Sequence, residues 1–329
     1  MPDVLITENI LGEEMDRLRE EFDCVFEPEL WKRPEELAAM IPAFRALIAR
    51  NQTQITRELI EAGARLEVIA RAGVGMDNVD LEAATRAGIV VSWTPEQNSN
   101  SVAELAIGLI LGLARMIPEA DVDTKRGGWD RRRFMGVEVL GKTLGIVGLG
   151  RIGSATAAKA RALGMEILAN DPYIDPQGLR PMEVRARMAS FEDVLAHADF
   201  VTVHVPETDE TRGMFGDAAF ARMKPTAFFI NAARGGIVQE EALLRALQER
   251  RIAGAALDVR RQEPAAPSGL DELPNVILLP HIAAQTHEAQ RRVVTAVCRD
   301  VAAILRGEPA RHVVNFDRPR KTAQERSHD

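Results

Sequence analysis

The chain has 329 residues, of which 46% are hydrophobic and 27% are charged, and its formal net charge is −8. This length is enough for two domains of ordinary size. The acidic balance disfavours nucleic acid or an anionic membrane as a partner. The two cysteines, Cys24 and Cys298, have no metal-ligand spacing, and the N-terminus lacks the pattern of a secretory signal. We therefore expect a cytoplasmic protein that binds no metal.

The first hundred residues alternate short apolar runs with amphipathic segments, which predicts a parallel, doubly wound sheet. Polar loops follow two of the expected strands, RNQT at 50–53 and RAGVGMDN at 71–78. Ligands bind beyond the carboxyl ends of the strands in such sheets, so both loops are candidates for binding a substrate. Arg50 suits a carboxylate ligand, and an ordinary solvated charge is the alternative. The expected strands are 4–6, 24–26, 46–49, 68–70 and 89–91, and the expected helices are 13–20, 34–40, 57–62 and 80–87.

A turn-rich segment at 92–98 (SWTPEQN) has the composition of a hinge, and a long apolar helix is expected after it, over 100–117. Residues 117–141 then form a polar arm that contains Trp129. An exposed tryptophan on such an arm suits a contact between subunits. Packing of Trp129 on its own domain is the alternative.

The segment 143–171, TLGIVGLGRIGSATAAKARALGMEILAND, reads as strand, glycine turn, helix, strand and terminal acid. Gly148 allows a tight turn, Gly150 lets the backbone approach a pyrophosphate, and Gly153 lets the helix pack closely on the strand. N–H groups at the start of the helix attract phosphate. Asp171 suits the ribose hydroxyls and repels a 2′-phosphate, so the segment predicts NAD binding in preference to NADP.

The second half continues with expected strands at 200–205, 227–231, 254–259 and 276–279 and a helix at 239–249. Three polar residues fall at strand ends or in loops: Arg234 in NAARGG, Glu263 in RRQEP and His281 in LLPHIAAQT. Histidine changes its charge nearest to neutral pH, so His281 is the candidate proton shuttle. Beside a nicotinamide, this trio would interconvert a 2-oxo acid and a 2-hydroxy acid. Spacing alone leaves other interpretations open: His281 as a core histidine, Glu263 as a surface acid and Arg234 as a turn residue.

These motifs resemble the D-isomer-specific 2-hydroxyacid dehydrogenase family, and within it they are most similar to phosphoglycerate dehydrogenases. The resemblance implies an α/β fold of two Rossmann-like, doubly wound parallel-sheet domains. A flavodoxin-like catalytic domain (1–98 and 285–317) would carry an inserted NAD-binding domain (99–284), followed by a polar tail at 318–329. An NAD-dependent oxidoreductase that forms a homodimer is implied. The carrying motifs lie at 71–89, 99–105, 128–153, 230–238, 255–259 and 278–286.

The resemblance also assigns roles to individual residues. His281 would be the acid/base, Glu263 its partner, and Arg234 the ligand of the substrate carboxylate. The substrate would also meet Arg50, Asn51 and the backbone amides of Val74 and Gly75. The implied cofactor contacts are Gly148, Gly150, Arg151, Ile152 and Gly153 at the pyrophosphate, Asp171 at the ribose, Val205 and Ala232 along the site, and Asp258 and Ala284 near the nicotinamide.

The substrate loop departs from phosphoglycerate dehydrogenases, which commonly have Arg-Ser followed by Lys. This chain has the sequence RNQTQ at 50–54, so one cation for a phosphate is missing. We therefore expect a small anionic acid of the hydroxypyruvate/glycerate kind. 3-Phosphoglycerate and a sulfolactate-type acid are the alternatives, because Arg50 can supply a counter-charge. Arg260 also departs from the family, which usually has an aromatic residue there.

Two relatives of this family define the remaining alternatives. Formate dehydrogenases have Gln where this chain has Glu263, so they are disfavoured. NAD-sensing corepressors keep the trio and are the non-enzymatic alternative, but they carry long disordered extensions. Only a dozen polar residues are expected after the last domain here, and no regulatory domain with serine feedback is expected.

Overall fold

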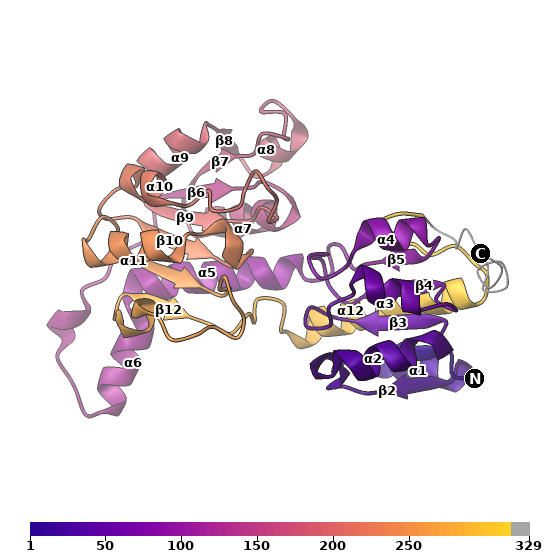
Figure 1. Ribbon diagram of the computed structural model, residues 1–329. Coiled ribbons are helices and arrows are strands. Elements are labelled where there is room, and N and C mark those ends of the chain that lie inside the picture. The colour runs from indigo at the N-terminus through magenta and orange to yellow at the C-terminus, as the bar shows by residue number, and fades with distance from the viewer. Residues whose placement is uncertain (317–329) are drawn as a thin grey trace. The chain divides into compact units, whose positions relative to one another are not determined.

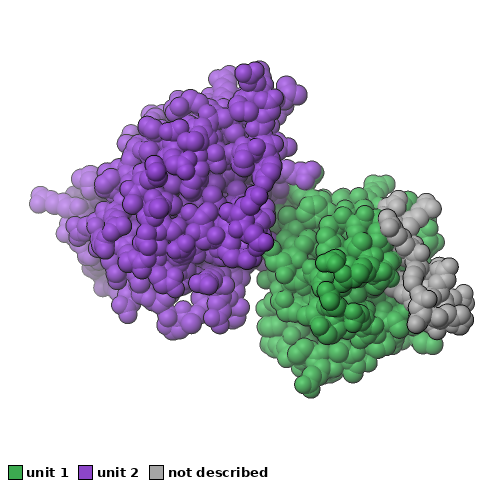
Figure 2. Space-filling view, turned by 45° about the horizontal axis from the view of Figure 1, so that its top comes forward, with its two compact units in different colours: residues 1–98, 286–329 green, residues 99–285 purple. Residues whose placement is uncertain are grey.

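The computed structural model describes residues 1–316, and the chain forms two compact units, each built on one parallel sheet (Figures 1 and 2). Unit 1 contains residues 1–98 and the segment that begins at Thr286, and unit 2 contains Ser99–Gln285. The expected polar tail at 318–329 lies outside the described residues. Within residues 1–316, no single helix is long and apolar enough to cross a membrane. One bent pair of helices, at Ser99–Arg115 and Ile117–Lys125, is long and apolar enough when the two are taken together, by length and composition alone.

The sheet of unit 1 has the strand order β2-β1-β3-β4-β5, and all its neighbours are parallel. This is the order of flavodoxin-like folds. Figure 1 shows α12 lying along this sheet, where it contacts β3, β4 and β5. The elements are β1 (Val4–Ile6), α1 (Glu13–Glu21), β2 (Cys24–Phe26), α2 (Pro34–Met40), β3 (Ala46–Ala49), α3 (Arg57–Ala62), β4 (Val68–Arg71), α4 (Leu81–Arg86), β5 (Val90–Ser92) and α12 (His287–Leu305), with short 3-10 turns at Leu30–Lys32 and Ile41–Ala43.

Both faces of this sheet are covered, because successive side chains of a strand point to opposite faces. In β3, Ala46 and Ile48 pack in the core shared with α1 and α12. Leu47 and Ala49 pack in the other core, with residues of α2, α3 and α4. Burial on both sides explains why the strands are mostly apolar instead of alternating with polar residues.

The sheet of unit 2 has seven parallel strands in the order β12-β11-β10-β9-β6-β7-β8. Read from β8, its first six strands follow the order of dinucleotide-binding folds, and β12 adds a seventh. The elements are α5 (Ser99–Arg115), α6 (Ile117–Lys125), β6 (Thr143–Val147), α7 (Arg151–Ala162), β7 (Glu166–Asn170), α8 (Leu179–Glu183), β8 (Ala186–Met188), α9 (Phe191–His197), β9 (Phe200–Val203), α10 (Asp217–Arg222), β10 (Phe228–Asn231), α11 (Glu240–Gln248), β11 (Gly254–Leu257) and β12 (Val276–Leu278), with 3-10 turns at Arg131–Phe134, Gly235–Ile237 and Gly269–Glu272.

Two cores also flank this second sheet. Leu144 and Ile146 of β6 pack in the core shared with α5 and α7. Val147 packs in the other core, with residues of α9, α10 and α11. The predicted fold class, two doubly wound parallel-sheet domains, is therefore confirmed.

Candidate active site

The glycine turn of unit 2 joins β6 to α7, as predicted. Gly148 has a φ of +94°, and a Cβ there would lie 2.8 Å from the carbonyl group of His204. A Cβ on Gly153 would overlap the carbonyl oxygen of Gly148. At Gly150, by contrast, no atom of the described chain lies within 4 Å of a Cβ position. The turn therefore needs glycine for its shape at two positions and leaves open space at the third, where a phosphate can approach the start of α7.

Asp171 follows β7 directly and is held beside this turn. One carboxylate oxygen accepts the Leu149 N–H at 2.9 Å, and the other accepts the Tyr173 N–H at 3.0 Å. These two bonds fix the carboxylate next to the backbone between Gly148 and Gly150. The predicted ribose acceptor and the predicted pyrophosphate turn thus share one edge of the sheet.

Other predicted cofactor residues gather around a small apolar cluster in unit 2. Ala232, directly after β10, is buried with Val102 and Ala283, and Ile152 of α7 packs against them. Ala284 is the next residue of the same loop. Val205 lies on the other side of the turn, where its side chain would contact a Cβ on Gly148.

Three neighbouring strands position the predicted trio. Arg234 follows β10, Glu263 lies in the loop after β11, and His281 lies in the loop after β12. Because β10, β11 and β12 are adjacent, their carboxyl ends meet at one edge. The Nδ1 atom of His281 lies 2.7 Å from Oε2 of Glu263, and the two side chains are 34% and 35% exposed. The structure therefore brings the histidine and the carboxylate together.

Two buried polar residues hold the loops of the trio. Asp258 is fully buried, and its two oxygens accept the N–H groups of Ile282 and Ala283, each at 2.8 Å. Asn231 is also fully buried; its amide donates to the Arg234 carbonyl oxygen at 2.9 Å and accepts the Ala233 N–H at 3.0 Å. The loops that carry Arg234 and His281 are thus each fixed to the sheet by a residue at a strand end. The family resemblance predicts a cofactor contact for Asp258, and nothing in the sequence indicates this bracing role.

The charge of Glu263 is set by its surroundings. Burial by itself would raise its pKa, but the hydrogen bond and charge of His281, the backbone N–H of Arg260 and the charge of Arg234 outweigh burial, so the pKa of Glu263 is lowered. A carboxylate only accepts hydrogen bonds, so Nδ1 of His281 must be the donor. Its Nε2 is then the nitrogen that remains to exchange a proton with a substrate.

Arg260 supports the same loop. Its guanidinium forms two hydrogen bonds with Glu240, at 3.1 and 2.7 Å, and its side chain is only 8% exposed. Its backbone N–H donates to Glu263 at 3.1 Å. At the position where the family usually has an aromatic residue, this chain therefore has a nearly buried ion pair between α11 and the loop of Glu263.

His204 is a further residue near the glycine turn, and its position was not predicted from the sequence. It follows β9, and its backbone faces Gly148 where β6 and β9 are neighbours and the strand order reverses. Its Nε2 lies 3.1 Å from the Thr202 hydroxyl, and its buried Nδ1 has no hydrogen-bond partner within residues 1–316. Burial lowers the pKa of His204 to about 4. The ring is therefore neutral in the folded protein at neutral pH.

This lowered pKa predicts a pH-dependent stability. Between pH 6.5 and 4, His204 binds a proton in the unfolded chain but not in the folded chain. The free energy of unfolding therefore falls by on the order of 2 kcal/mol as the pH drops through this range. Denaturant unfolding at pH 7 and pH 4.5 measures it. We expect His204→Gln to reduce the fall, whereas His197→Gln, which alters an exposed histidine on α9, should leave it unchanged. An equal fall in wild type and His204→Gln would contradict the assignment.

The predicted substrate loops lie in unit 1. Arg50 follows β3, and its guanidinium donates to the side-chain oxygen of Gln290 on the first turn of α12. Burial lowers the pKa of Arg50, and the charge of Glu8 opposes that effect. Arg50 is therefore a partly buried cation with a fixed partner, not a freely solvated charge. Asn51 is exposed.

The second substrate loop follows β4. Within residues 1–316, the N–H groups of Val74 and Gly75 donate no hydrogen bond to backbone or side chain. Two such neighbouring donors suit a carboxylate. The guanidinium of Arg71 lies against Gly73 in the same loop, and only 8% of Arg71 is exposed.

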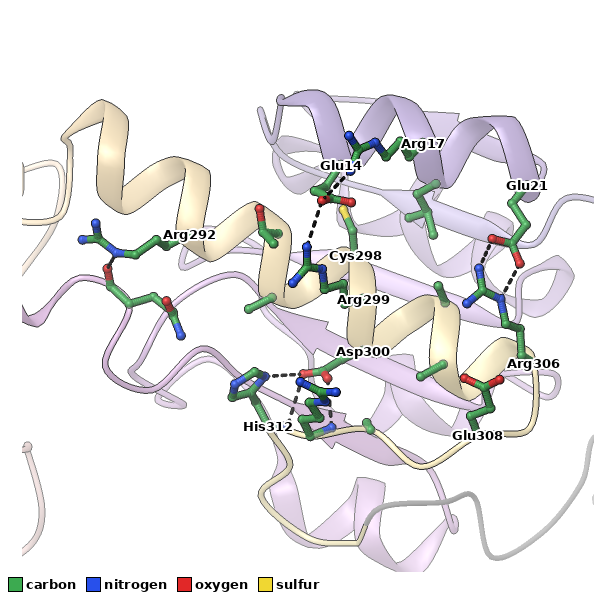
Figure 3. A pocket seen from close by; sticks show the side chains of 18 of the residues that line it. Glu14, Arg17, Glu21, Arg292, Cys298, Arg299, Asp300, Arg306, Glu308 and His312 are labelled. Atoms are coloured by element: carbon green, nitrogen blue, oxygen red, sulfur yellow. Dashed lines mark hydrogen bonds and ion pairs between the residues drawn. The ribbon is translucent and has the colours of Figure 1, made fainter.

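A cavity of about 1380 Å³ lies elsewhere in unit 1, between α1, α12 and the chain after α12 (Figure 3). Two ion pairs cross it: Arg299 contacts Glu14 at 3.2 Å, and Arg306 contacts Glu21. None of the predicted site residues is among the residues that line it. In residues 1–316, no group of three or more His, Cys, Asp and Glu side chains could hold a metal ion.

Comparison with known proteins identifies the class that this fold and site define. Residues 107–283 match the family model described as "D-isomer specific 2-hydroxyacid dehydrogenase, NAD binding domain". The chain belongs to this family, and unit 2 holds the family's NAD-binding domain.

Individual relatives are similar over most of the chain. A D-3-phosphoglycerate dehydrogenase from Archaeoglobus fulgidus is 43% identical over 95% of this chain and 59% of its own length. The TT0316 protein from Thermus thermophilus is 33% identical with a TM-score of 0.89, covering 95% of this chain and 99% of that one. A glyoxylate reductase from Paecilomyes thermophila is 32% identical with a TM-score of 0.85 over the same shares. The chain spans about half to three-fifths of the length of the curated relatives it matches.

Proposed function

We propose that the protein is an NAD-dependent D-2-hydroxyacid dehydrogenase that acts on a small anionic acid of the hydroxypyruvate/glycerate kind. The observation that carries this proposal is the 2.7 Å contact between Nδ1 of His281 and Glu263. Arg234 follows β10, the strand beside β11, at the same edge of the sheet. A glyoxylate reductase among the similar structures supports a small substrate.

In this proposal each member of the trio has one task. Arg234 binds the substrate carboxylate and orients the 2-oxo group. His281 donates a proton from Nε2 to the carbonyl oxygen, and Glu263 stabilises the imidazolium form that can do so. NADH supplies the hydride when it is bound. In the reverse direction His281 accepts the hydroxyl proton, so one arrangement serves both directions.

3-Phosphoglycerate is the second candidate substrate. The curated relatives at 43–47% identity are named for it. Arg71, nearly buried against Gly73, supplies a second cation beside Arg50 in unit 1. Two arginines partly offset the missing lysine of the 50–54 loop.

A substrate screen tests the proposed function. NADH oxidation is followed at 340 nm with glyoxylate, hydroxypyruvate, phosphohydroxypyruvate, sulfopyruvate, pyruvate and oxaloacetate. We expect hydroxypyruvate or glyoxylate to give the highest kcat/KM. Preference for phosphohydroxypyruvate would favour the second candidate. Tight NADH binding without turnover of any acid would favour an NAD-sensing protein instead.

Asp171 is expected to set the choice of NAD over NADP. Its carboxylate would face the ribose 2′-position, where it repels a phosphate. We predict that Asp171→Ala raises the NADP/NAD ratio of kcat/KM by on the order of tenfold to a hundredfold. Asp175→Ala is the matched control, because Asp175 also accepts a backbone N–H in the same loop. An unchanged ratio in Asp171→Ala would remove Asp171 from the cofactor site.

We also infer a cytoplasmic homodimer that associates through the arm at 117–141. The arm exposes large apolar side chains that its own unit does not cover: Ile117 54%, Trp129 80%, Met135 81% and Leu140 69% exposed. The helix α6 within it buries none of its residues.

Light scattering should give twice the chain mass. Cys24 and Cys298 are free thiols, which fits a reducing compartment.

A further inference from the structure

The loop at 50–53 stands where the strand order of unit 1 reverses. β1 lies between β2 and β3, so the chain leaves β1 toward one side and β3 toward the other. Ligands of open α/β sheets bind beyond the strand ends at such a point. Thr7 and Glu8 follow β1 there, and residues 50–53 follow β3.

Glu8 is a buried carboxylate directed at this loop. It is 2% exposed. One oxygen accepts the N–H groups of Arg50 and Thr53, at 2.8 and 3.0 Å, and the Thr53 hydroxyl at 2.8 Å. The other oxygen accepts the Gln52 N–H at 3.3 Å. Within residues 1–316 no cation forms a salt bridge with it, although its charge acts on the guanidinium of Arg50. A buried charge is costly unless donors compensate it, and here all of the donors come from one loop.

Asn78 binds the same loop through its carbonyl groups. Its side-chain N–H₂ donates to the carbonyl oxygens of Arg50 and Thr53, each at 2.7 Å, and Asn78 is 8% exposed. The backbone carbonyl oxygen of Asn78 accepts the Ile55 N–H at 2.8 Å. Glu8 thus accepts three of the four N–H groups of the loop, and Asn78 donates to two of its C=O groups. Since Asn78 ends the loop of Val74 and Gly75, it also ties the two predicted substrate loops together.

We propose that Glu8 and Asn78 are positioning residues that hold the 50–53 loop in its substrate-binding shape. This inference rests on the proposed function. Glu8 fixes the backbone N–H of Arg50, and Gln290 fixes the guanidinium, so the cation enters the site with both ends held. A loop fixed before binding loses little entropy when the acid binds. Glu8 and Asn78 therefore act on substrate affinity through Arg50 and Asn51.

Glu8→Gln tests this role with almost no change in volume. The amide replaces an acceptor oxygen with an N–H₂ group that faces backbone donors, so the loop loses hydrogen bonds. We expect KM for the 2-oxo acid to rise about tenfold, which corresponds to about 1.4 kcal/mol. The kcat at saturation and the Kd for NADH should stay within twofold, because the trio and the glycine turn lie in unit 2. Glu8→Asp, which keeps the charge, should recover part of the affinity.

Glu67→Gln is the matched control. Glu67 is also a largely buried carboxylate of unit 1, 16% exposed, and it accepts two hydrogen bonds from Arg45, at 2.7 and 3.3 Å. It precedes β4, so it lies at the amino ends of the strands. We expect Glu67→Gln to lower the melting temperature without changing KM. An equal KM in the two variants would overturn the positioning role.

Hydrogen exchange separates this inference from the proposed function. In Glu8→Gln, the amides of Arg50, Gln52 and Thr53 should exchange about tenfold faster than in wild type, and in Glu67→Gln they should not. If wild type reduces no 2-oxo acid, the proposed function fails, and this exchange pattern still decides whether Glu8 holds the loop. Unchanged exchange at these amides in Glu8→Gln would overturn the inference.

Discussion

Replacing His281 with alanine is expected to lower kcat by about 10²- to 10⁴-fold, the usual contribution of a positioned general acid. The affinity for NADH should stay the same, because the glycine turn and Asp171 lie on other strands of the sheet. Steady-state turnover and fluorescence titration with NADH measure the two quantities separately.

His312→Ala is the matched control for this variant. His312 forms a similar pair, with its Nδ1 3.0 Å from the carboxylate of Asp300, but it lies in unit 1 after α12. Loss of a histidine–carboxylate pair should leave kcat unchanged there. Comparable losses in the two variants would mean that His281 supports the fold and not the reaction.

Glu263 should keep the pair intact over the working pH range. Its lowered pKa means that its charged form is favoured in the folded state. The stabilisation it provides is therefore fully present above the ordinary carboxyl pKa, near 4.3, and is lost only as the pH falls through the lower folded value. At neutral pH, titration of Glu263 does not limit His281.

Replacing Arg234 with glutamine should lower kcat/KM for the 2-oxo acid through loss of the carboxylate ligand. Removal of one partner from a hydrogen-bonded charge pair costs about 2–5 kcal/mol, so we expect a loss of about 30-fold or more. Arg234→Lys should recover only part of it, since lysine cannot bind a carboxylate through two parallel hydrogen bonds.

Arg261→Gln controls for the loss of positive charge in this region. Arg261 lies in the neighbouring loop of unit 2 and its side chain is exposed. We expect its kcat/KM to match wild type. A loss below fivefold in Arg234→Gln, or an equal loss in both variants, would show that Arg234 does not bind the substrate.

The sequence predicted most elements because their patterns are local. The helix α3 was predicted with its bounds unchanged, and Thr56 caps it by accepting the Leu59 N–H. The helices α8, α9 and α10, of five to seven residues each, were not predicted individually; α3 is equally short, so helix length does not account for the difference. The composition of residues 117–141 predicts a polar arm, and the structure places in it the helix α6, which lacks a buried face.

The site was predictable as single residues but not as an arrangement. Glu263 precedes His281 by eighteen residues, and only the adjacency of β11 and β12 brings them to hydrogen-bonding distance. The residues that hold the site loops in place were even harder to predict from the sequence. Glu8 lies in an ordinary polar turn, and its partners come from more than forty residues away. Partners brought together by strand order leave no local pattern in a sequence.

The proposed reaction is reversible hydride transfer at a site that selects one enantiomer of a 2-hydroxy acid. The most direct measurement is the rise of absorbance at 340 nm after the protein is mixed with NAD and either D- or L-glycerate, with His281→Ala in parallel. We predict that NADH forms with the D enantiomer and wild type only. NADH formation from L-glycerate, or equal rates with His281→Ala, would contradict the account.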